Sequence, residues 1–211
     1  MRNTSTPEMG NIPPLSFSEL RQLLASARSV RKFDASRSVP ADTLLNIVGL
    51  CRLTPSGRNI QPFKYRIVDD PDDCNRIFPL LSWAGYLKDW PGPEPHERPA
   101  AYLVQCLDTH LAADPLCDDG LQLQALTLGI RACGLGSCII KAFNAPKLAE
   151  TLAIPENLMP RYVLAIGFPA EKVVIEDMKG NAYEYWREPD GSHHVPKRQL
   201  SELIISPDKH N

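Results

Sequence analysis

Basic and amide side chains occur together in three short parts of the chain, and their types suit a phosphorylated, flat heterocycle. These residues are Arg28, Ser29 and Arg31, then Ser56, Asn59 and Gln61 between Pro55 and Pro62, and finally Lys197 with Arg198. Guanidinium forks and ammonium groups suit a phosphate. Amide groups donate and accept at once, which suits the edge of a heterocycle. The combination predicts a site for a small anionic ligand.

Other motifs that could carry chemistry are weaker. Gly134-Leu-Gly136-Ser137 resembles half of a dinucleotide fingerprint, but it follows a predicted helix and lacks the third glycine. These glycines are therefore expected to close the helix. The sequence contains no Walker pattern and no Gly-x-Ser-x-Gly elbow.

Acidic, histidine and cysteine residues give no sharp pattern. Asp118 and Asp119 with His110 could serve acid–base chemistry, but acids are also favoured at a helix N-terminus, which we prefer. None of the 6 cysteines forms a Cys-x-x-Cys pair, so we expect reduced, mostly buried thiols and no metal site.

Composition excludes several classes of protein. The chain has 211 residues, which favours one domain, and its formal net charge of −2 argues against sequence-independent nucleic-acid binding. No apolar run reaches the roughly 18 residues of a membrane span, and the polar N-terminus lacks a leader pattern. The sequence thus predicts a cytoplasmic protein without membrane contact.

The elements that must position these side chains follow from periodicity and from proline. A capping box at Ser16–Glu19 predicts the start of a first helix. Further helices are expected between Pro40 and about Thr54, and over 71–81, 118–135 and 144–152. Strands are expected over 63–68, 100–107 and 161–168, and residues 82–99 are expected to form a long irregular loop.

Two parts of the chain suggest a second subunit. The helix at 118–135 carries one apolar stripe with Leu123 and Leu126 and another with Leu121 and Leu128, so it is expected to be covered on two sides. Residues 171–205 are polar and aromatic, and they are predicted to form an extended arm that packs on a partner chain. Residues 1–15 are expected to be a flexible arm and residues 206–211 a tail.

Taken together and in order, these motifs resemble the FMN-dependent nitroreductase family. Arg28-Ser-Val-Arg-Lys-Phe33 is similar to the family's Arg-Ser-x-Arg-x-Phe signature, and Pro55-Ser-Gly-Arg-Asn-Ile-Gln-Pro62 to its Pro-Ser-x-x-Asn-x-Gln-Pro loop. The segment from Gly134 to Ile140, Ala165-Ile-Gly-Phe-Pro169 and the basic motif at Pro196–Leu200 extend the similarity over roughly residues 16–205.

The resemblance implies an α+β fold with a mixed, mainly antiparallel sheet flanked by helices. It implies a single FMN-binding domain over 16–205, in a domain-swapped homodimer with FMN at the interface. The family carries out ping-pong hydride transfer, in which NAD(P)H reduces flavin N5 and a nitroaromatic, quinone or similar flat acceptor then takes the electrons. No side chain is then needed as a nucleophile.

The resemblance also assigns residues to the cofactor. Arg28, Ser29 and Arg31 would hold the ribityl-phosphate and the pyrimidine edge, and Arg31 would stabilise the charge of the reduced flavin. Asn59, with Ser56 and Gln61, would contact the isoalloxazine, and Lys197 and Arg198 would reach the phosphate. The full set is Arg28, Ser29, Arg31, Pro55, Ser56, Asn59, Gln61, Gly136, Lys141, Lys197 and Arg198.

Two departures from the family and one loop keep alternatives open. Ala27 stands where the family usually has a further arginine, and Lys141-Ala142 where many members have Glu-Gly. A flavin-binding protein that is not a reductase, or a relative with specialised chemistry such as dehalogenation, therefore stays an alternative. In the 82–99 loop, Trp83, Tyr86 and Trp90 could form a substrate lid. Trp83 and Tyr86 could equally pack the loop onto the core.

Overall fold

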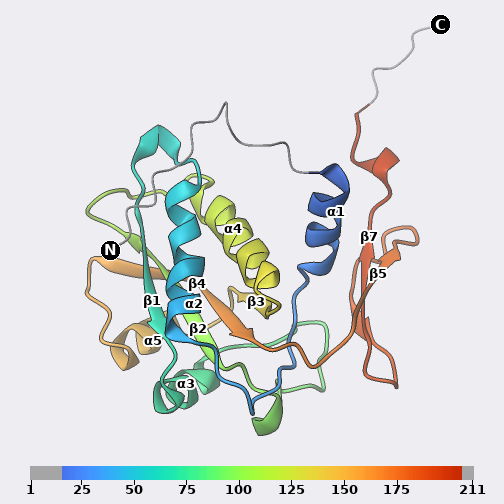
Figure 1. The fold of residues 1–211 in the computed structure, drawn as a ribbon, viewed down its shortest axis with the longest axis horizontal. Coiled ribbons are helices and arrows are strands. Elements are labelled where there is room, and N and C mark those ends of the chain that lie inside the picture. The colour runs from blue at the N-terminus through green and yellow to red at the C-terminus, as the bar shows by residue number, and fades with distance from the viewer. Residues whose placement is uncertain (1–15, 206–211) are drawn as a thin grey trace, which may run out of the picture.

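The computed structural model describes residues 16–205, which form a four-stranded sheet covered by helices and, beside it, a smaller three-stranded sheet (Figure 1). The arm predicted at 1–15 and the tail predicted at 206–211 lie outside the described residues. The α-helices are α1 (Phe17–Ser26), α2 (Ala41–Gly49), α3 (Pro71–Ile77), α4 (Asp118–Ala132) and α5 (Ala145–Thr151).

The main sheet is antiparallel throughout, in the order β1-β2-β4-β3. Its strands are β1 (Phe63–Val68), β2 (Ala101–Asp108), β3 (Gly136–Ile140) and β4 (Leu158–Gly167). The predictions for β1 and β2 are confirmed, and β4 begins earlier than expected. The sequence reading missed β3, because its residues were interpreted only as the close of the preceding helix.

Alternate residues of the central strand β2 pack on opposite faces of the sheet. Leu103 faces α2 and α4 and joins a cluster with Leu44 and Leu126, whereas Val104 joins a second cluster on the α3 and α5 side with Ile77 and Leu148. Helices therefore cover both faces (Figure 1). A strand buried on both faces is expected to be almost continuously apolar, as β2 is apart from the buried Gln105 and the terminal Asp108.

Helix boundaries depend on local caps that the sequence predicted only in part. Ser16 precedes α1, but its side chain makes no capping hydrogen bond, so the predicted capping box is wrong. Asn144 does cap α5 by accepting a hydrogen bond from the Lys147 amide. Gly134, with φ of 75°, ends α4 shortly before the expected residue 135, because glycine adopts this left-handed conformation without strain.

The two stripes of α4 differ in burial. Leu123, Leu126 and Ile130 are buried against the sheet, whereas Leu121 on the other stripe is 39% exposed in the single chain. Helix α1, which lies between α4 and the small sheet in Figure 1, has no buried residue. Both helices therefore present exposed apolar side chains within the part of the chain that the structure describes.

The C-terminal segment forms a sheet of its own, which the sequence reading did not predict. Strands β5 (Val173–Asp177) and β7 (His193–Lys197) pair in parallel, and the two-residue strand β6 (Trp186–Arg187) pairs with β7 in the antiparallel direction. The predicted arm at 171–205 is therefore an ordered layer that folds back on the N-terminal segment. None of the helices among residues 16–205 is long and apolar enough to cross a membrane.

Candidate functional site

A hollow of about 330 Å³ lies between α4, β3, the small sheet and the segment after α1. The residues that line it are Ala27, Arg28, Ser29, Arg31, Gln124, Thr127, Ser137, Ile139, Tyr185, Val195 and Lys197. Three of these side chains are cationic and none is acidic, so the hollow is positively charged. Four of the predicted cofactor residues are thus brought together from opposite ends of the chain.

The segment that carries Arg28 and Arg31 is fixed against β3. The Val30 amide donates to the Ser137 carbonyl at 2.8 Å, and Ser29 and Ser137 form an isolated bridge. A Cβ atom on Gly136 would lie 3.0 Å from Val30 Cγ2, tighter than most contacts of this kind, so the close approach favours glycine at this position. Gly136 thus allows the Arg28–Arg31 segment to pack on β3, but it does not line the hollow itself. It lines a neighbouring hollow of about 250 Å³.

Arg31 is the most constrained cation of the hollow, with only 9% of its surface exposed. Its Nη1 lies 3.0 Å from Nε2 of His193 and 3.4 Å from the Ser29 carbonyl oxygen, and its guanidinium lies 4.7 Å from the Tyr185 ring centroid. The Arg31 amide donates to Glu171. Both the backbone and the side chain of Arg31 are therefore held by the C-terminal segment.

His193 is fully buried beside two arginines. Burial, followed by the positive charges of Arg31 and Arg187, lowers the pKa of His193 to about 4. The imidazole is therefore neutral at physiological pH.

The loop from Pro55 to Pro62, which we name the amide loop, is held to α4 through the side chain of Asp118. Asp118 at the start of α4 accepts a hydrogen bond from the Ser56 hydroxyl at 2.5 Å and one from the Gly57 amide at 2.8 Å. The exposed residues Asn59 and Gln61 have positive φ values of 56° and 53°, which non-glycine residues adopt at a cost. Strain of this kind is concentrated at functional sites.

This loop does not line the hollow of its own chain. The lining does not include Pro55, Ser56, Asn59 or Gln61. The first residue of α4 that lines the hollow is Gln124, which lies about two helical turns beyond Asp118, the residue that holds the loop. The amide groups of Asn59 and Gln61 instead contact each other, with Gln61 Nε2 donating to Asn59 Oδ1 at 3.0 Å.

Two other predicted cations also lie outside the hollow. Arg198 pairs with Glu202 at 3.0 Å, on the exposed surface. Lys141 donates to the Arg161 carbonyl at 3.0 Å and lies over the Tyr162 ring. Burial, followed by the nearby charge of Arg161, lowers the pKa of Lys141. Of the C-terminal pair, only Lys197 faces the hollow.

The aromatic residues of the 82–99 loop have different surroundings. Trp83 is buried in the core beside Phe78, so it packs the loop onto the core. Tyr86 is 46% exposed, and its ring centroid lies 4.9 Å from that of Tyr185, which lines the hollow. Trp90 lies under the guanidinium of Arg187, at 4.5 Å.

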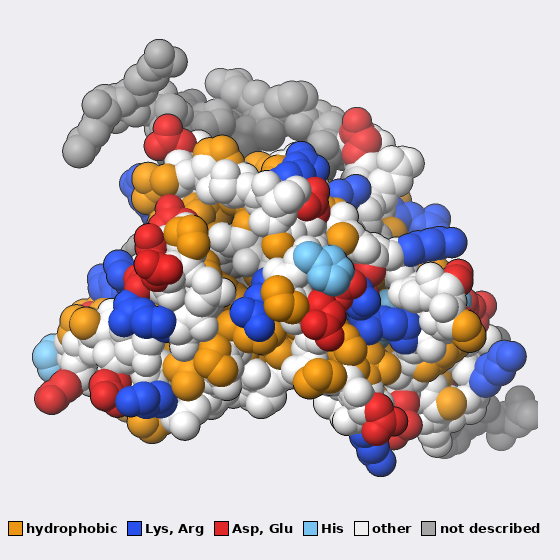
Figure 2. Space-filling model, turned by 90° about the horizontal axis from the view of Figure 1, so that it is seen from below, with side chains coloured by type: hydrophobic (Ala, Val, Ile, Leu, Met, Phe, Trp, Pro, Cys, Tyr) orange, Lys and Arg blue, Asp and Glu red, His pale blue; other side chains and the backbone are white. Residues whose placement is uncertain are grey.

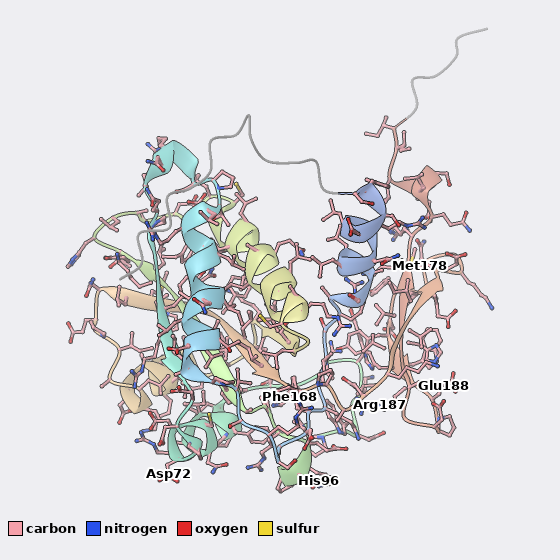
Figure 3. All side chains as sticks on the ribbon, in the orientation of Figure 1. Asp72, His96, Phe168, Met178, Arg187 and Glu188 are labelled. Atoms are coloured by element: carbon pink, nitrogen blue, oxygen red, sulfur yellow. The ribbon has the colours of Figure 1, made fainter. Side chains whose placement is uncertain are left out.

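Arg187 connects this loop to the rest of the site. Figure 3 shows it on the side of the small sheet that faces the main body, where its Nη2 donates to Glu171 at 2.9 Å. Glu171 in turn accepts from the Arg31 amide. The loop and the hollow therefore share contacts with the small sheet.

Several site residues were missed by the sequence reading. The sequence around Asp118 predicts a helix-start acid or an acid–base group, and its role as a loop anchor has no local sequence signal. Tyr185, His193 and Glu171 were not assigned to the site, because their positions depend on how the small sheet folds back. Gln124, Thr127 and Ser137 were missed for the same kind of reason.

Potential metal ligands and thiols are dispersed over the described residues. No group of three or more His, Cys, Asp or Glu side chains that could hold a metal occurs among residues 16–205. All 6 cysteines are free, and burial raises the pKa of the Cys138 thiol to about 11. On the face seen in Figure 2, basic, acidic and apolar side chains are interspersed, without a continuous basic surface.

Comparison with known proteins agrees with this arrangement. The model of the nitroreductase family matches residues 24–112. A protein of Archaeoglobus fulgidus named for NADH dehydrogenase and NAD(P)H nitroreductase activity is 23% identical over 162 residues, covering 73% of this chain and 87% of the relative. An iodotyrosine deiodinase of Haliscomenobacter hydrossis is 27% identical over 193 residues, covering 76% and 84%.

Solved structures establish the fold. A nitroreductase family protein from Streptococcus pneumoniae superposes with a TM-score of 0.61 at 16% identity, covering 89% of this chain and 100% of that one. An FMN-dependent nitroreductase from Clostridium difficile gives a TM-score of 0.58 at 20% identity, covering 76% and 91%. The family match over residues 24–112, the relatives over most of the chain and the shared α+β fold agree: the chain is similar to proteins of the nitroreductase family.

Proposed function

We propose that this oxidoreductase binds FMN in the cationic hollow and uses NAD(P)H to reduce flat, electron-poor acceptors such as nitroaromatics and quinones. The observation that carries the proposal is the donor set of the hollow, in which Arg28, Arg31 and Lys197 lie together without an acidic side chain. Three cations with hydroxyl and amide donors fit a phosphate on a polar chain. The NAD(P)H assignment is supported by the name of the archaeal relative.

Each cation has a distinct role in this proposal. Arg28 and Lys197 would hold the phosphate, with Ser29 donating from the same segment. Arg31, fixed by His193 and Tyr185, would face the pyrimidine edge and stabilise negative charge there. Bound FMN would supply the hydride chemistry, while the chain binds the cofactor, orients it and tunes its potential.

The amide loop fits the proposal if it serves a second copy of the chain. Asn59 and Gln61 are exposed and do not line their own hollow. Uncovered apolar side chains occur on α1, α4, β3 and the C-terminal segment, namely Phe17, Leu20, Leu24, Leu121, Ile139, Leu200, Leu203, Ile204 and Ile205. We therefore propose a homodimer in which each loop completes the site of its partner, as in the family that the sequence resembles.

Absorbance and titration test the cofactor assignment directly. Purified protein, or apoprotein reconstituted with FMN, is expected to show the flavin bands and to quench flavin fluorescence stoichiometrically. Oxidation of NADH or NADPH is then followed with a quinone and with a nitroaromatic. A protein that cannot be loaded with FMN contradicts the proposal. A loaded protein that oxidises neither nicotinamide indicates a flavin-binding protein that is not a reductase.

A mixed dimer tests the shared site. Arg31→Ala and Asn59→Ala are each expected to weaken FMN binding when both subunits carry the same change. A dimer purified through two different tags, with one change in each subunit, would contain one site with both defects and one intact site. Recovery of tight binding at half the sites is expected. If the loop serves its own chain, both sites stay defective and no recovery occurs.

Reductive dehalogenation is a second candidate for the same site. It is favoured by the similarity to an iodotyrosine deiodinase, which covers 76% of this chain. The relevant comparison is turnover of a halogenated tyrosine against turnover of a quinone by one FMN-loaded preparation. Exposed Tyr86 and half-buried Trp90 are the proposed substrate contacts, and Trp90→Ala is expected to change the ratio between acceptors. An unchanged ratio would contradict that role.

A further inference from the structure

The side chain of Arg31 meets a buried histidine from the other end of the chain. Nη1 of Arg31 lies 3.0 Å from Nε2 of His193, and no surface of His193 is exposed. Tyr185 packs against both, with its ring centroid 5.0 Å from that of His193 and 4.7 Å from the guanidinium carbon of Arg31. The three side chains form a compact unit at one wall of the hollow.

The chemistry of this contact fixes the form of the histidine. A guanidinium has only donors, so Nε2 of His193 must be the acceptor and cannot carry a proton. The neutral ring then carries its proton on Nδ1, which is buried and has no hydrogen-bond partner among residues 16–205. An uncompensated buried donor is costly. The position of the His193 ring therefore satisfies the hydrogen bond from Arg31 to Nε2 and leaves Nδ1 without a partner.

The charges around the ring also favour the neutral form. Arg31 and Arg187 face His193 from two elements, and His194 is next to it in the strand. Glu171 is already engaged by the Arg31 amide and by the Arg187 guanidinium. A protonated His193 would lose its role as acceptor for Arg31 and would lie beside two fixed positive charges.

We propose that His193 is a positioning residue for cofactor binding, because its unprotonated Nε2 holds the Arg31 guanidinium at the wall of the hollow. The inference rests on the proposed function, since FMN is the ligand that Arg31 would meet. His193 does not line the hollow, so its effect is exerted through Arg31.

Two substitutions at position 193 separate this role from simple packing. His193→Leu removes the acceptor but keeps an apolar side chain of moderate size, and it is expected to weaken FMN binding by about tenfold, the size of one lost charge-assisted hydrogen bond. His193→Gln can place an oxygen near the position of Nε2 and is expected to retain most of the affinity. His194→Leu is the matched control, because His194 bonds to Ser192 and Glu176 instead.

A double-mutant cycle shows whether His193 acts through Arg31. Once Arg31 is replaced by alanine, His193→Leu is expected to cause no further loss of FMN affinity. An equal tenfold loss in both backgrounds, or no loss in the wild-type background, would overturn the proposal. These titrations measure binding and do not depend on turnover.

A measurement on the unmodified protein keeps the proposal testable if His193→Leu does not fold. In apoprotein labelled with nitrogen-15, NMR correlations of the imidazole are expected to show His193 with a bare Nε2 and a protonated Nδ1 at pH 7. A proton on Nε2 of His193 would overturn the proposal.

The outcomes also distinguish this inference from the proposed function. If the wild-type protein does not bind FMN, the function fails whatever the state of His193. If it binds FMN and Arg31→Ala weakens the binding, whereas His193→Leu does not, only the positioning role is excluded.

Discussion

The two polar regions of the site are held in different ways. The cationic hollow is assembled from four parts of the chain, and its central residue, Arg31, is contacted by His193, Tyr185 and Glu171. The amide loop is one continuous segment that Asp118 anchors among residues 16–205, and the side chains of Asn59 and Gln61 are exposed. Charged groups at a partly buried site need fixed partners within the chain, whereas exposed amides can be ordered by the ligand or by a second subunit.

The strongest test of this contrast is the removal of Arg31. Arg31→Ala is expected to weaken FMN binding on the order of 10–100-fold, because a hydrogen bond to a charged group contributes ~1.5–3 kcal/mol. The flavin potential of the loaded protein is expected to become more negative by about 30–65 mV, as the same energy gives for a two-electron couple.

Arg198→Ala provides the control for that experiment. Arg198 is a surface arginine paired with Glu202, so its removal is expected to change FMN affinity little. An unchanged potential in fully loaded Arg31→Ala protein would contradict the tuning role of Arg31. A large effect at Arg198 would restore the phosphate contact that the sequence suggested.

The hollow should also depend on pH, because its support includes a neutral histidine. The folded pKa of His193 is about 4, below the ordinary value of 6.5, so the unfolded chain binds a proton first as the pH falls. The unfolding free energy is therefore expected to decrease below about pH 6.5, by about 2 kcal/mol at pH 5. Urea unfolding at pH 7 and pH 5, compared with His193→Gln, measures this contribution. Equal pH dependence in both proteins would contradict it.

A smaller effect is expected at the anchor of the amide loop. Asp118→Ala removes the acceptor for Ser56 and Gly57 and is expected to lower the unfolding free energy by about 1–2 kcal/mol and to weaken FMN binding. Asp119→Ala, one residue away, removes a contact of 3.5 Å with Arg161 and an exposed hydrogen bond from the Gly120 amide, and it should cost less. Similar losses for the two variants, measured by denaturation, would show that the loop does not depend on Asp118.

The smallest expected effect concerns the contact between the 82–99 loop and the hollow. Tyr86→Leu removes an edge-to-face pair with Tyr185 and is expected to cost about 1 kcal/mol or less of stability. Because Tyr86 is a proposed substrate contact and does not itself line the hollow, KM for the acceptor should change more than FMN affinity. A larger change in FMN affinity would place Tyr86 in the support of the hollow.

Prediction from sequence succeeded where short-range patterns decide the structure. The alternation at 63–68 and the apolar run at 100–107 correspond to β1 and β2, and the long periodic segment from Asp118 corresponds to α4. Prediction failed for β3 and for the small sheet. The strand at Gly136–Ile140 is stabilised by pairing with β4, and β5 pairs with β7 across about twenty residues, so neither has a sufficient local signal.

The sequence by itself determined the family-like motifs, the identity of the cations and the amides, and most elements of the core, because these depend on residue type and short spacing. Only the tertiary structure decided which predicted residues share a site. It placed Lys197 beside Arg28 and Arg31, directed Arg198 to Glu202, and left the amide loop apart from the hollow of its own chain. It also brought His193 to Arg31, across 162 positions of sequence. Contacts of this range depend on how the small sheet folds back, which no local pattern encodes.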